Sequence, residues 1–423
     1  MTRRSTSSIC IELILPCCIS FFSACKEESL NKKITNSSFK QLNKITKLSM
    51  AGIYIYIPFC KKACHYCNFH FSTSQKQIPK IIGAICAEGA LRNDYLHEDI
   101  ATVYFGGGTP SLITIYDLRF TIEKLKSLFR IVDDAEITLE ANPDDITEEK
   151  LEGWKSVGIN RLSIGVQSFF DEDLQWMNRA HNSLQARAAV ALSKEAGFEN
   201  VSIDLIYAVP GLTDQRWQQN LETAFDYGVS HLSCYALTVE PKTALRKMIE
   251  HYKKEDVNAE KQAAQFELLM EHTDAAGYEH YEISNFSKPG FRSKHNSSYW
   301  QGKPYLGLGP SAHSYNGLSR QWNVSNNALY IESISKKILP QEEELLTQTQ
   351  KVNEYLMTSL RTSEGISLKA VEQLSDEPTA LQIFKEAQKF IHQKLIGVNE
   401  STLFLTRKGK LFADGIASDL FRT

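Results

Sequence analysis

Short apolar runs alternate with amphipathic stretches along most of the chain after residue 52. The runs are rich in β-branched and aromatic residues, which is typical of strands buried on both faces. The stretches between them repeat their apolar residues every three to four positions, which is typical of helices that cover a sheet. This alternation predicts an α/β fold with parallel strands and right-handed crossovers. The predicted strands are Ile53–Ile57, Thr102–Phe105, Glu136–Leu139, Arg161–Gly165, Val201–Ile206 and His231–Leu237.

Glycines mark the ends of several predicted helices. Gly158, Gly197 and Gly228 each follow a helical stretch and precede a strand, where glycine accepts the left-handed conformation that ends a helix. Only residues 52–285 show the alternation, and they contain about six strand–helix units. Because a complete eight-fold barrel needs ~250 residues, we predict a partial (β/α)6 barrel. The predicted helices are Leu118–Phe129, Glu148–Val157, Leu184–Ala196 and Gln215–Tyr227.

The pattern changes after residue 285. Residues 294–315 are dense in aromatic residues, glycine and histidine, and we expect a structured loop segment there. From residue 341 onward, three helices and a hairpin predict a small, mainly α, winged-helix-like domain. It has no basic recognition helix, so the sequence favours a packing module over DNA binding. The helices are predicted at Val352–Arg361, Leu368–Gln373 and Ala380–Gln393, and the hairpin strands at Ile396–Asn399 and Leu403–Thr406.

The first 49 residues differ from the rest in charge. They hold 8 Lys and Arg against 3 Asp and Glu, whereas the whole chain has a formal net charge of -3. We expect that Met50 is the true start and that residues 1–49 are a disordered or mis-assigned extension. The competing interpretation is an export signal, because Arg3, Arg4 and an apolar run precede Cys25. The predicted division is 1–49, a barrel at 50–285, an aromatic and His-rich connecting segment at 286–340 and a C-terminal domain at 341–423.

The cysteines are the most informative part of the amino-acid composition. With 42% hydrophobic and 23% charged residues the chain has an ordinary composition, and its small net charge gives no reason to expect a nucleic-acid partner. The nine cysteines are not spread as in a disulfide-stapled secreted domain. Cys60, Cys64 and Cys67 instead lie close together, which indicates a metal or cluster site in a reducing compartment. We therefore expect a cytoplasmic protein.

The triplet has the chemistry of an iron–sulfur site. Thiolates are soft ligands suited to iron–sulfur clusters and to zinc. Three of them can hold three corners of a [4Fe-4S] cubane and leave the fourth iron without a protein thiolate. The amino and carboxylate groups of S-adenosylmethionine can fill that corner, and an electron from the cluster can then cleave the sulfonium C–S bond. The alternative is a zinc site, with His65 or His70 as the fourth ligand.

A glycine run follows the second predicted strand. Gly106, Gly107 and Gly108 precede Thr109 and Pro110. Consecutive glycines let the backbone approach a ligand closely, because no Cβ stands in the way. Alone the run indicates a tight turn. At the end of the strand next to the triplet, it suits the polar groups of S-adenosylmethionine.

These motifs together resemble the oxygen-independent coproporphyrinogen III oxidase superfamily of radical SAM proteins. The resemblance rests on Tyr54–Cys60, the triplet, the glycine run, Leu139–Pro143, Gly165–Phe169 and Ile203–Tyr207, and it covers residues 50–423. It implies S-adenosylmethionine sites lined by Tyr54, Tyr66, Gly107, Gly108, Thr109, Glu140, Gln167, Arg179, Asp204 and Ala236. Most of these residues lie at or near predicted strand ends, but only the resemblance nominates Arg179.

Within the superfamily the chain is most similar to the HemW-type heme chaperones. Phe69 stands where the true oxidases have a further cysteine, and Tyr56 stands where relatives commonly have histidine. The resemblance also implies heme binding by residues 295–300, with His295 as the axial ligand near the cluster rim. A neutral imidazole is a good ligand for heme iron. His313 is a second candidate, and a hydrogen-bonded loop histidine is the plain alternative for His295.

The function implied is binding of heme and its delivery to acceptor proteins, which belongs to porphyrin metabolism. The implied partners are heme, heme-accepting proteins that include membrane-associated respiratory ones, and an electron donor. Two alternatives stay open: the decarboxylating coproporphyrinogen oxidase, and a winged-helix binding protein with a structural metal.

Overall fold

A computed structural model describes residues 50–423, so the expectations for residues 1–49 lie outside the described residues. Six parallel strands pair in chain order and form the centre of a single curved sheet. Each contains or overlaps one of the six predicted strands, so the predicted partial barrel is confirmed. The strands are β1 (Met50–Ile57), β2 (Asp99–Gly107), β3 (Ile131–Ala141), β4 (Arg161–Gln167), β5 (Asn200–Tyr207) and β6 (His231–Ala236).

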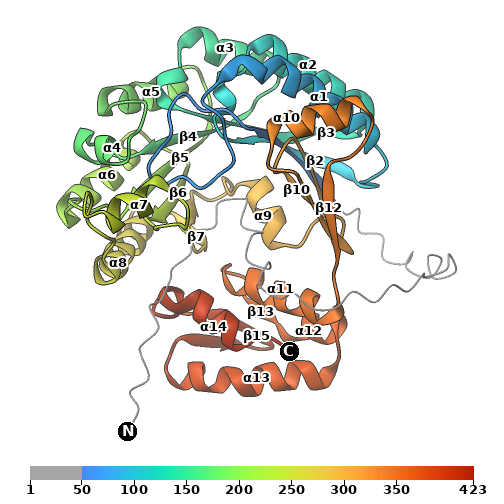
Figure 1. Cartoon of the computed structure of the whole chain (residues 1–423). Coiled ribbons are helices and arrows are strands. Elements are labelled where there is room, and N and C mark those ends of the chain that lie inside the picture. The colour runs from blue at the N-terminus through green and yellow to red at the C-terminus, as the bar shows by residue number, and fades with distance from the viewer. Residues whose placement is uncertain (1–49) are drawn as a thin grey trace, which may run out of the picture.

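Helices cover the outer face of this sheet (Figure 1). Four of them begin at a Thr or Asn whose side chain accepts a backbone N–H of the first turn. Gly158, Gly197 and Gly228 have φ values of 94°, 78° and 61°, as the helix ends require. The helices are α1 (Ile78–Leu91), α2 (Ile115–Leu128), α3 (Glu148–Ser156), α4 (Asp171–Trp176), α5 (Ser183–Glu195) and α6 (Asp214–Asp226).

The two faces of the barrel strands bury different side chains. Ile53, Ile55 and Ile57 belong to the large core beneath the helices, whereas Tyr54 and Tyr56 form a separate inner cluster with Tyr104 and Ala312. The inner face also carries buried polar residues, because alternate strand residues point to opposite faces. These residues include Thr102, Glu136, Arg161, Ser163, Ser202 and His231.

The expected loop at residues 294–315 is wrong. Most of that segment is regular structure, and its strand β9 pairs in parallel with β1 and so extends the sheet. The strands here are only three to five residues long, so their pattern along the chain is weak and pairing with an existing edge decides them. The elements are α9 (Lys294–Trp300), β9 (Tyr305–Leu308), β10 (His313–Tyr315), β11 (Ser319–Asn323), α10 (Asn327–Ser335) and β12 (Gln341–Leu345).

The other edge of the sheet is extended by a hairpin. β8 runs antiparallel to β6 and pairs with β7. Two further helices lead from β6 to this hairpin, and α7 lies close to the cysteine loop, where the amide of Leu245 donates to the His65 carbonyl (2.7 Å). The elements are α7 (Ala244–Glu250), α8 (Ala259–Ala275), β7 (Glu279–Glu282) and β8 (Asn285–Ser287).

A buried carboxylate ties the added strands to the barrel. Glu88 of α1 has no exposed surface and accepts from the Gly309 amide (2.9 Å), Tyr330 (2.5 Å) and Asn323 (2.7 Å). It also pairs with Arg92 (3.2 Å), one turn later on α1. One side chain therefore links α1, the β9–β10 connection, β11 and α10.

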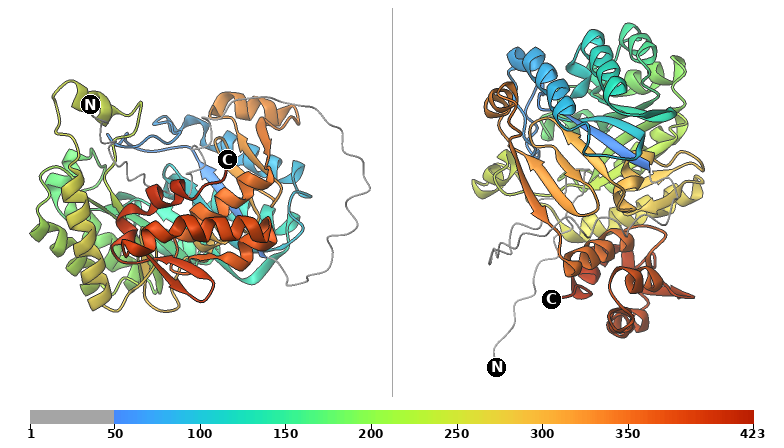
Figure 2. Two further views of the ribbon diagram at one scale, coloured as in Figure 1. Left: turned by 90° about the horizontal axis from the view of Figure 1, so that it is seen from below. Right: turned by 90° about the vertical axis from the view of Figure 1, so that its right-hand side faces the viewer.

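The C-terminal region has its own hydrophobic core and lies below the barrel in Figure 1 and in the right-hand view of Figure 2. All three predicted helices and the hairpin are present. Backbone bonds join the region to the β7–β8 hairpin: Ile283 N–H donates to the Arg361 carbonyl (3.0 Å) and Ser363 N–H to the Tyr281 carbonyl (2.9 Å). Within residues 50–423 no helix is long and apolar enough to cross a membrane. The elements are α11 (Gln348–Leu360), β13 (Ile366–Ser367), α12 (Leu368–Leu374), α13 (Glu377–His392), β14 (Ile396–Asn399), β15 (Thr402–Leu405) and α14 (Ala413–Asp419).

Candidate functional site

The cysteine loop begins where β1 ends. Cys60 donates its amide to the Ser72 carbonyl (3.1 Å), and the backbone N–H of His65 donates to the Met177 carbonyl (3.1 Å). These bonds tie both halves of the loop to the rest of the fold. Cys60, Cys64 and Cys67 are partly exposed free thiols. The loop thus presents three thiols at the C-terminal end of the first strand, as the sequence predicts.

The surroundings of the thiols favour the protonated form. Burial raises the pKa of Cys60 to about 11 and that of Cys67 to about 12. A thiol with such a pKa gives up its proton when a metal replaces it. Such pKa values are not those of an activated nucleophilic cysteine, whose pKa is lowered by its surroundings.

Three thiols with no fourth protein ligand converging on them in the described chain suit a cluster. Within the described chain no three His, Cys, Asp or Glu side chains are placed to share one metal ion. In a cubane each thiolate binds a different iron, so the thiols need not converge on one point. The imidazole of His65 bonds to the Trp176 carbonyl (3.0 Å) and that of His70 to the Asn327 side chain (2.8 Å). The donor set therefore fits a [4Fe-4S] cluster.

The glycine run packs directly against the start of the cysteine loop. Gly108 N–H donates to the Ile57 carbonyl (2.9 Å) and Thr109 N–H donates to the Phe59 carbonyl (2.7 Å). A Cβ on Gly108 would lie 2.5 Å from the Phe59 carbonyl oxygen, a contact that real Cβ atoms do not make. Gly107 has a φ of 106°, which other residues rarely adopt. Both glycines are therefore required by the backbone itself.

Changing Gly108 to Ala is expected to displace Phe59 and Cys60 and to lower the iron retained after reconstitution by at least half. The methyl group would meet three backbone atoms of Ile57 and Phe59, so no side-chain movement can relieve the contact. Iron and sulfide assays measure the effect, with circular dichroism as a check on folding. Gly83→Ala, on α1 with nothing within 4 Å of the new Cβ, is the control. Full iron content in the Gly108 variant would contradict the expectation.

Arg179 joins the cysteine loop to two strand ends. Its Nη1 approaches the Cys64 Sγ (3.3 Å) and the Tyr66 hydroxyl (3.4 Å), while its Nη2 donates to the Asn142 side chain (2.8 Å) and the Gly165 carbonyl (2.9 Å). Arg179 Nε is buried with no hydrogen-bond partner among the described residues. A buried cation at this place suits the carboxylate of a ligand such as S-adenosylmethionine.

Two carboxyl groups lie inside the barrel behind the glycine run. Glu140 accepts from the Tyr104 hydroxyl (2.8 Å), and burial together with the nearby Asp204 raises its pKa to about 8. Burial raises the pKa of Asp204 to about 6. Tyr54 stacks on Tyr104 with ring centroids 5.7 Å apart. Glu140 therefore holds a proton near neutral pH, and it can give up that proton to a bound group.

The remaining predicted residues lie at strand ends. Gln167 ends β4 with a φ of 65°, a strained conformation for a residue other than glycine. Tyr66 is held beside Arg179, and Ala236 ends β6. The structure thus brings Tyr66, Arg179 and the triplet together, with Gly107, Gly108 and Thr109 adjoining them. Their roles in binding S-adenosylmethionine stay predictions.

His295 does not lie at the cluster rim, and that expectation is wrong. It packs against Gly52 and Thr102, early in β1 and β2, whereas the triplet follows the end of β1. Its Nδ1 bonds to the Thr102 hydroxyl (2.7 Å) and its Nε2 to the Tyr299 hydroxyl (2.8 Å). Burial lowers its pKa to about 3, so the ring is neutral. An iron could bind Nε2 only after the Tyr299 hydroxyl moved away.

Two residues that support the site and its surroundings were not predicted from the sequence. The Asn142 side chain accepts a hydrogen bond from Arg179. Its position in the Glu-Ala-Asn-Pro stretch, directly after a predicted strand, could have indicated a residue of the site. Glu136 accepts the backbone N–H groups of Lys294 (3.0 Å) and His295 (2.9 Å) and so anchors α9 to the barrel. A carboxylate at an inward position of a buried strand is the signal for such a residue.

Known proteins resemble both parts of the chain. Residues 54–224 match the radical SAM superfamily model and residues 346–412 match the HemN C-terminal domain model. Over 374 residues the chain is 34% identical to the heme chaperone HemW of Bacillus subtilis, with 87% of this chain and 98% of that protein covered. It is 32% identical to the HemW of Mycobacterium tuberculosis, with 87% and 94% covered. It is also 31% identical to a mitochondrial radical S-adenosyl methionine domain-containing protein of Dictyostelium discoideum, with 92% and 98% covered.

A solved structure shows the same fold. Coproporphyrinogen III oxidase HemN of Escherichia coli superimposes with a TM-score of 0.77 and 23% identity, over 88% of this chain and 90% of that one. That likeness concerns the fold, whereas the sequence matches extend over nearly the whole length of the chaperones. The chain therefore belongs to the HemW heme-chaperone family of radical SAM proteins.

Proposed function

We propose that this protein binds heme and delivers it to acceptor proteins, with a [4Fe-4S] cluster on Cys60, Cys64 and Cys67 and with S-adenosylmethionine beside it. The observation that carries the proposal is the match to heme chaperones along 98% of the length of one of them. The proposal places the protein in the cytoplasm, in keeping with the free thiols of all five described cysteines.

The residues around the triplet have definable roles in this proposal. When bound, the cluster and S-adenosylmethionine supply one-electron chemistry and a cleavable sulfonium bond. Arg179 orients the ligand carboxylate and at the same time braces the loop through Cys64. The glycine run offers backbone groups at close range. Glu140 holds a proton at its carboxyl group, beside the Tyr104 hydroxyl.

The α9 segment supports the heme part of the proposal. Asn296 Oδ1, Ser297 Oγ and Trp300 Nε1 are buried and have no hydrogen-bond partner within residues 50–423. Three such atoms on one short helix are unusual, because buried polar groups are normally paired. A ligand or water beside α9 would satisfy them. The oxidase alternative is supported by the fold and by the match of residues 346–412 to the HemN C-terminal domain model. The Tyr56 hydroxyl, where relatives commonly have histidine, donates to the His70 carbonyl (2.8 Å).

Heme titration, followed by the Soret absorbance, tests the proposal. Our proposal keeps His295 as the axial ligand of the heme, which requires the Tyr299 hydroxyl to move off its Nε2. Wild type should then bind heme, and His295→Ala should bind it at least tenfold more weakly with a shifted Soret band. Tyr299→Phe should bind about fivefold more tightly, because the hydroxyl that competes with iron for His295 Nε2 is gone and one hydrogen bond contributes about 1 kcal/mol.

His251→Ala, at an exposed position after α7, is the matched control and should behave as wild type. Unchanged binding and an unchanged spectrum in His295→Ala would remove the ligand assignment. Absence of heme binding in wild type would remove the proposed function itself.

A further inference from the structure

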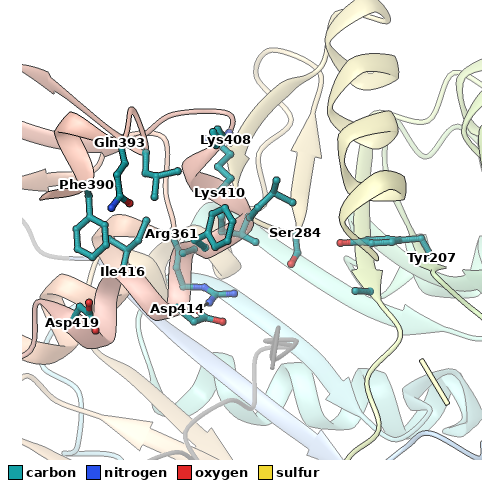
Figure 3. Close-up of a pocket in the computed structure, with 17 residues that line it drawn as sticks. Tyr207, Ser284, Arg361, Phe390, Gln393, Lys408, Lys410, Asp414, Ile416 and Asp419 are labelled. Carbon is teal, nitrogen blue, oxygen red and sulfur yellow. Dashed lines mark hydrogen bonds and ion pairs between the residues drawn. The ribbon is translucent and has the colours of Figure 1, made fainter. Parts of the chain in front are cut away.

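A cavity of about 630 Å³ lies between the C-terminal region and the edge of the barrel (Figure 3). Its size is typical of small-molecule sites. In Figure 3 the residues of the C-terminal region gather on one side, and Tyr207, the last residue of β5, lies at the opposite end. The walls are largely apolar, with Ile283, Phe390, Leu395, Leu411, Phe412 and Ile416 among the lining residues.

The charges of this cavity are unbalanced toward the positive. Five charged side chains line it: Arg361, Lys408, Lys410, Asp414 and Asp419. Both carboxylates are already paired, Asp414 with Arg361 and Asp419 with Lys389. Neither lysine forms an ion pair within the described chain.

Lys410 is the less exposed of the two cavity lysines. Its Nζ donates to the Nδ1 of His280 (2.8 Å), and burial lowers its pKa to about 8. Glu282 acts on Lys410 electrostatically but forms no ion pair with it, and its side chain is bonded to Asn285. A partly buried amine without an ion-pair partner is stabilised by a nearby anion.

Arg361 links the cavity to α9. Its side chain is 3% exposed, and its Nε has no hydrogen-bond partner among residues 50–423. Its guanidinium carbon lies 5.8 Å from the ring centre of Trp300, the last residue of α9. The same arginine therefore faces the cavity and the helix with the unpaired polar atoms.

We propose that this cavity holds the acidic end of heme, with Lys410 and Arg361 binding its carboxylates and the apolar walls packing against the macrocycle. The inference rests on the proposed function, since heme is the cargo it assigns. Heme joins a large apolar ring to two carboxylates, which matches an apolar cavity that contains cations and lacks a free carboxylate. Arg361 lines the cavity and lies against Trp300, so the cavity is close to the segment that the heme proposal already invokes.

The test compares heme with heme dimethyl ester, in which both carboxylates are blocked. Full-length protein is titrated with each at one fixed detergent concentration, and the Soret absorbance is recorded. Wild type should prefer heme over the ester by about ten- to hundredfold, the usual effect of a charge-assisted hydrogen bond. Lys410→Met should lose most of that preference while it binds the ester as wild type does, which also shows that it is folded. Lys385→Met, an exposed α13 position outside the cavity, should keep the preference.

Each outcome separates the two proposals. If wild type binds heme and Lys410→Met keeps the full preference over the ester, the cavity assignment is overturned and the proposed function stands. Equal binding of heme and ester by wild type overturns the assignment as well. If wild type binds neither, the proposed function fails and this inference fails with it.

Discussion

Replacing Cys60, Cys64 and Cys67 together with alanine is expected to reduce the iron content from about four per chain to near zero after anaerobic reconstitution. The three thiols are the cluster ligands we propose, and all are free and partly exposed at the end of β1. Loss of the ligands leaves iron with no soft donors in that loop. Iron and sulfide assays together with the visible absorbance of the cluster measure the change.

Cys86→Ala is the matched control for the triple variant. Cys86 is buried in α1, away from the loop, and should leave the iron content unchanged. Far-ultraviolet circular dichroism of the triple variant should match wild type, because the loop contributes little to the buried core. A cluster spectrum that survives in the triple variant would end the radical SAM interpretation of this chain.

Glu88→Ala is expected to destabilise the packing of β9–β11 on the barrel by about 3–5 kcal/mol, because it breaks a buried ion pair and leaves a cation uncompensated. Arg92 would keep its bonds to Gln321 (2.6 Å) and the Gly307 carbonyl (3.3 Å) but lose its only carboxylate in the described structure. The Gly309 amide and the Tyr330 hydroxyl would lose their acceptor.

Hydrogen exchange of the amides in residues 305–323 measures this effect locally. A local measurement suits this chain better than one global unfolding midpoint, because the barrel and the C-terminal region have separate hydrophobic cores. Protection of these amides should fall strongly in Glu88→Ala. Glu332→Ala on α10, whose exposed carboxylate pairs with Lys336 alone among residues 50–423, should show no measurable change. Equal protection in both variants would show that Glu88 does not hold these strands.

The sequence alone predicts the elements whose pattern is local. β1–β6 are long enough to show a continuous apolar run, and the helices between them carry their caps and terminal glycines in the chain itself. The cysteine motif is equally local, since its three thiols lie within eight residues. The helices and hairpin of the C-terminal region were predictable for the same reason.

Contacts between distant parts of the chain were decided only by the tertiary structure. Arg179 reaches Cys64 across 115 positions, and nothing near Arg179 in the sequence indicates it. The short strands β9–β12 carry too little pattern and form because an exposed sheet edge offers them partners.

His295 is the clearest example of a residue whose motif is visible in the sequence but whose position is decided by the fold. Its motif could be read from the sequence, but its burial between Thr102 and Tyr299, away from the cysteine loop, depends on how α9 enters the barrel. Periodicity and ligand spacing are properties of a continuous segment. Which side chain meets which neighbour depends on packing between segments, so only the folded chain determines it.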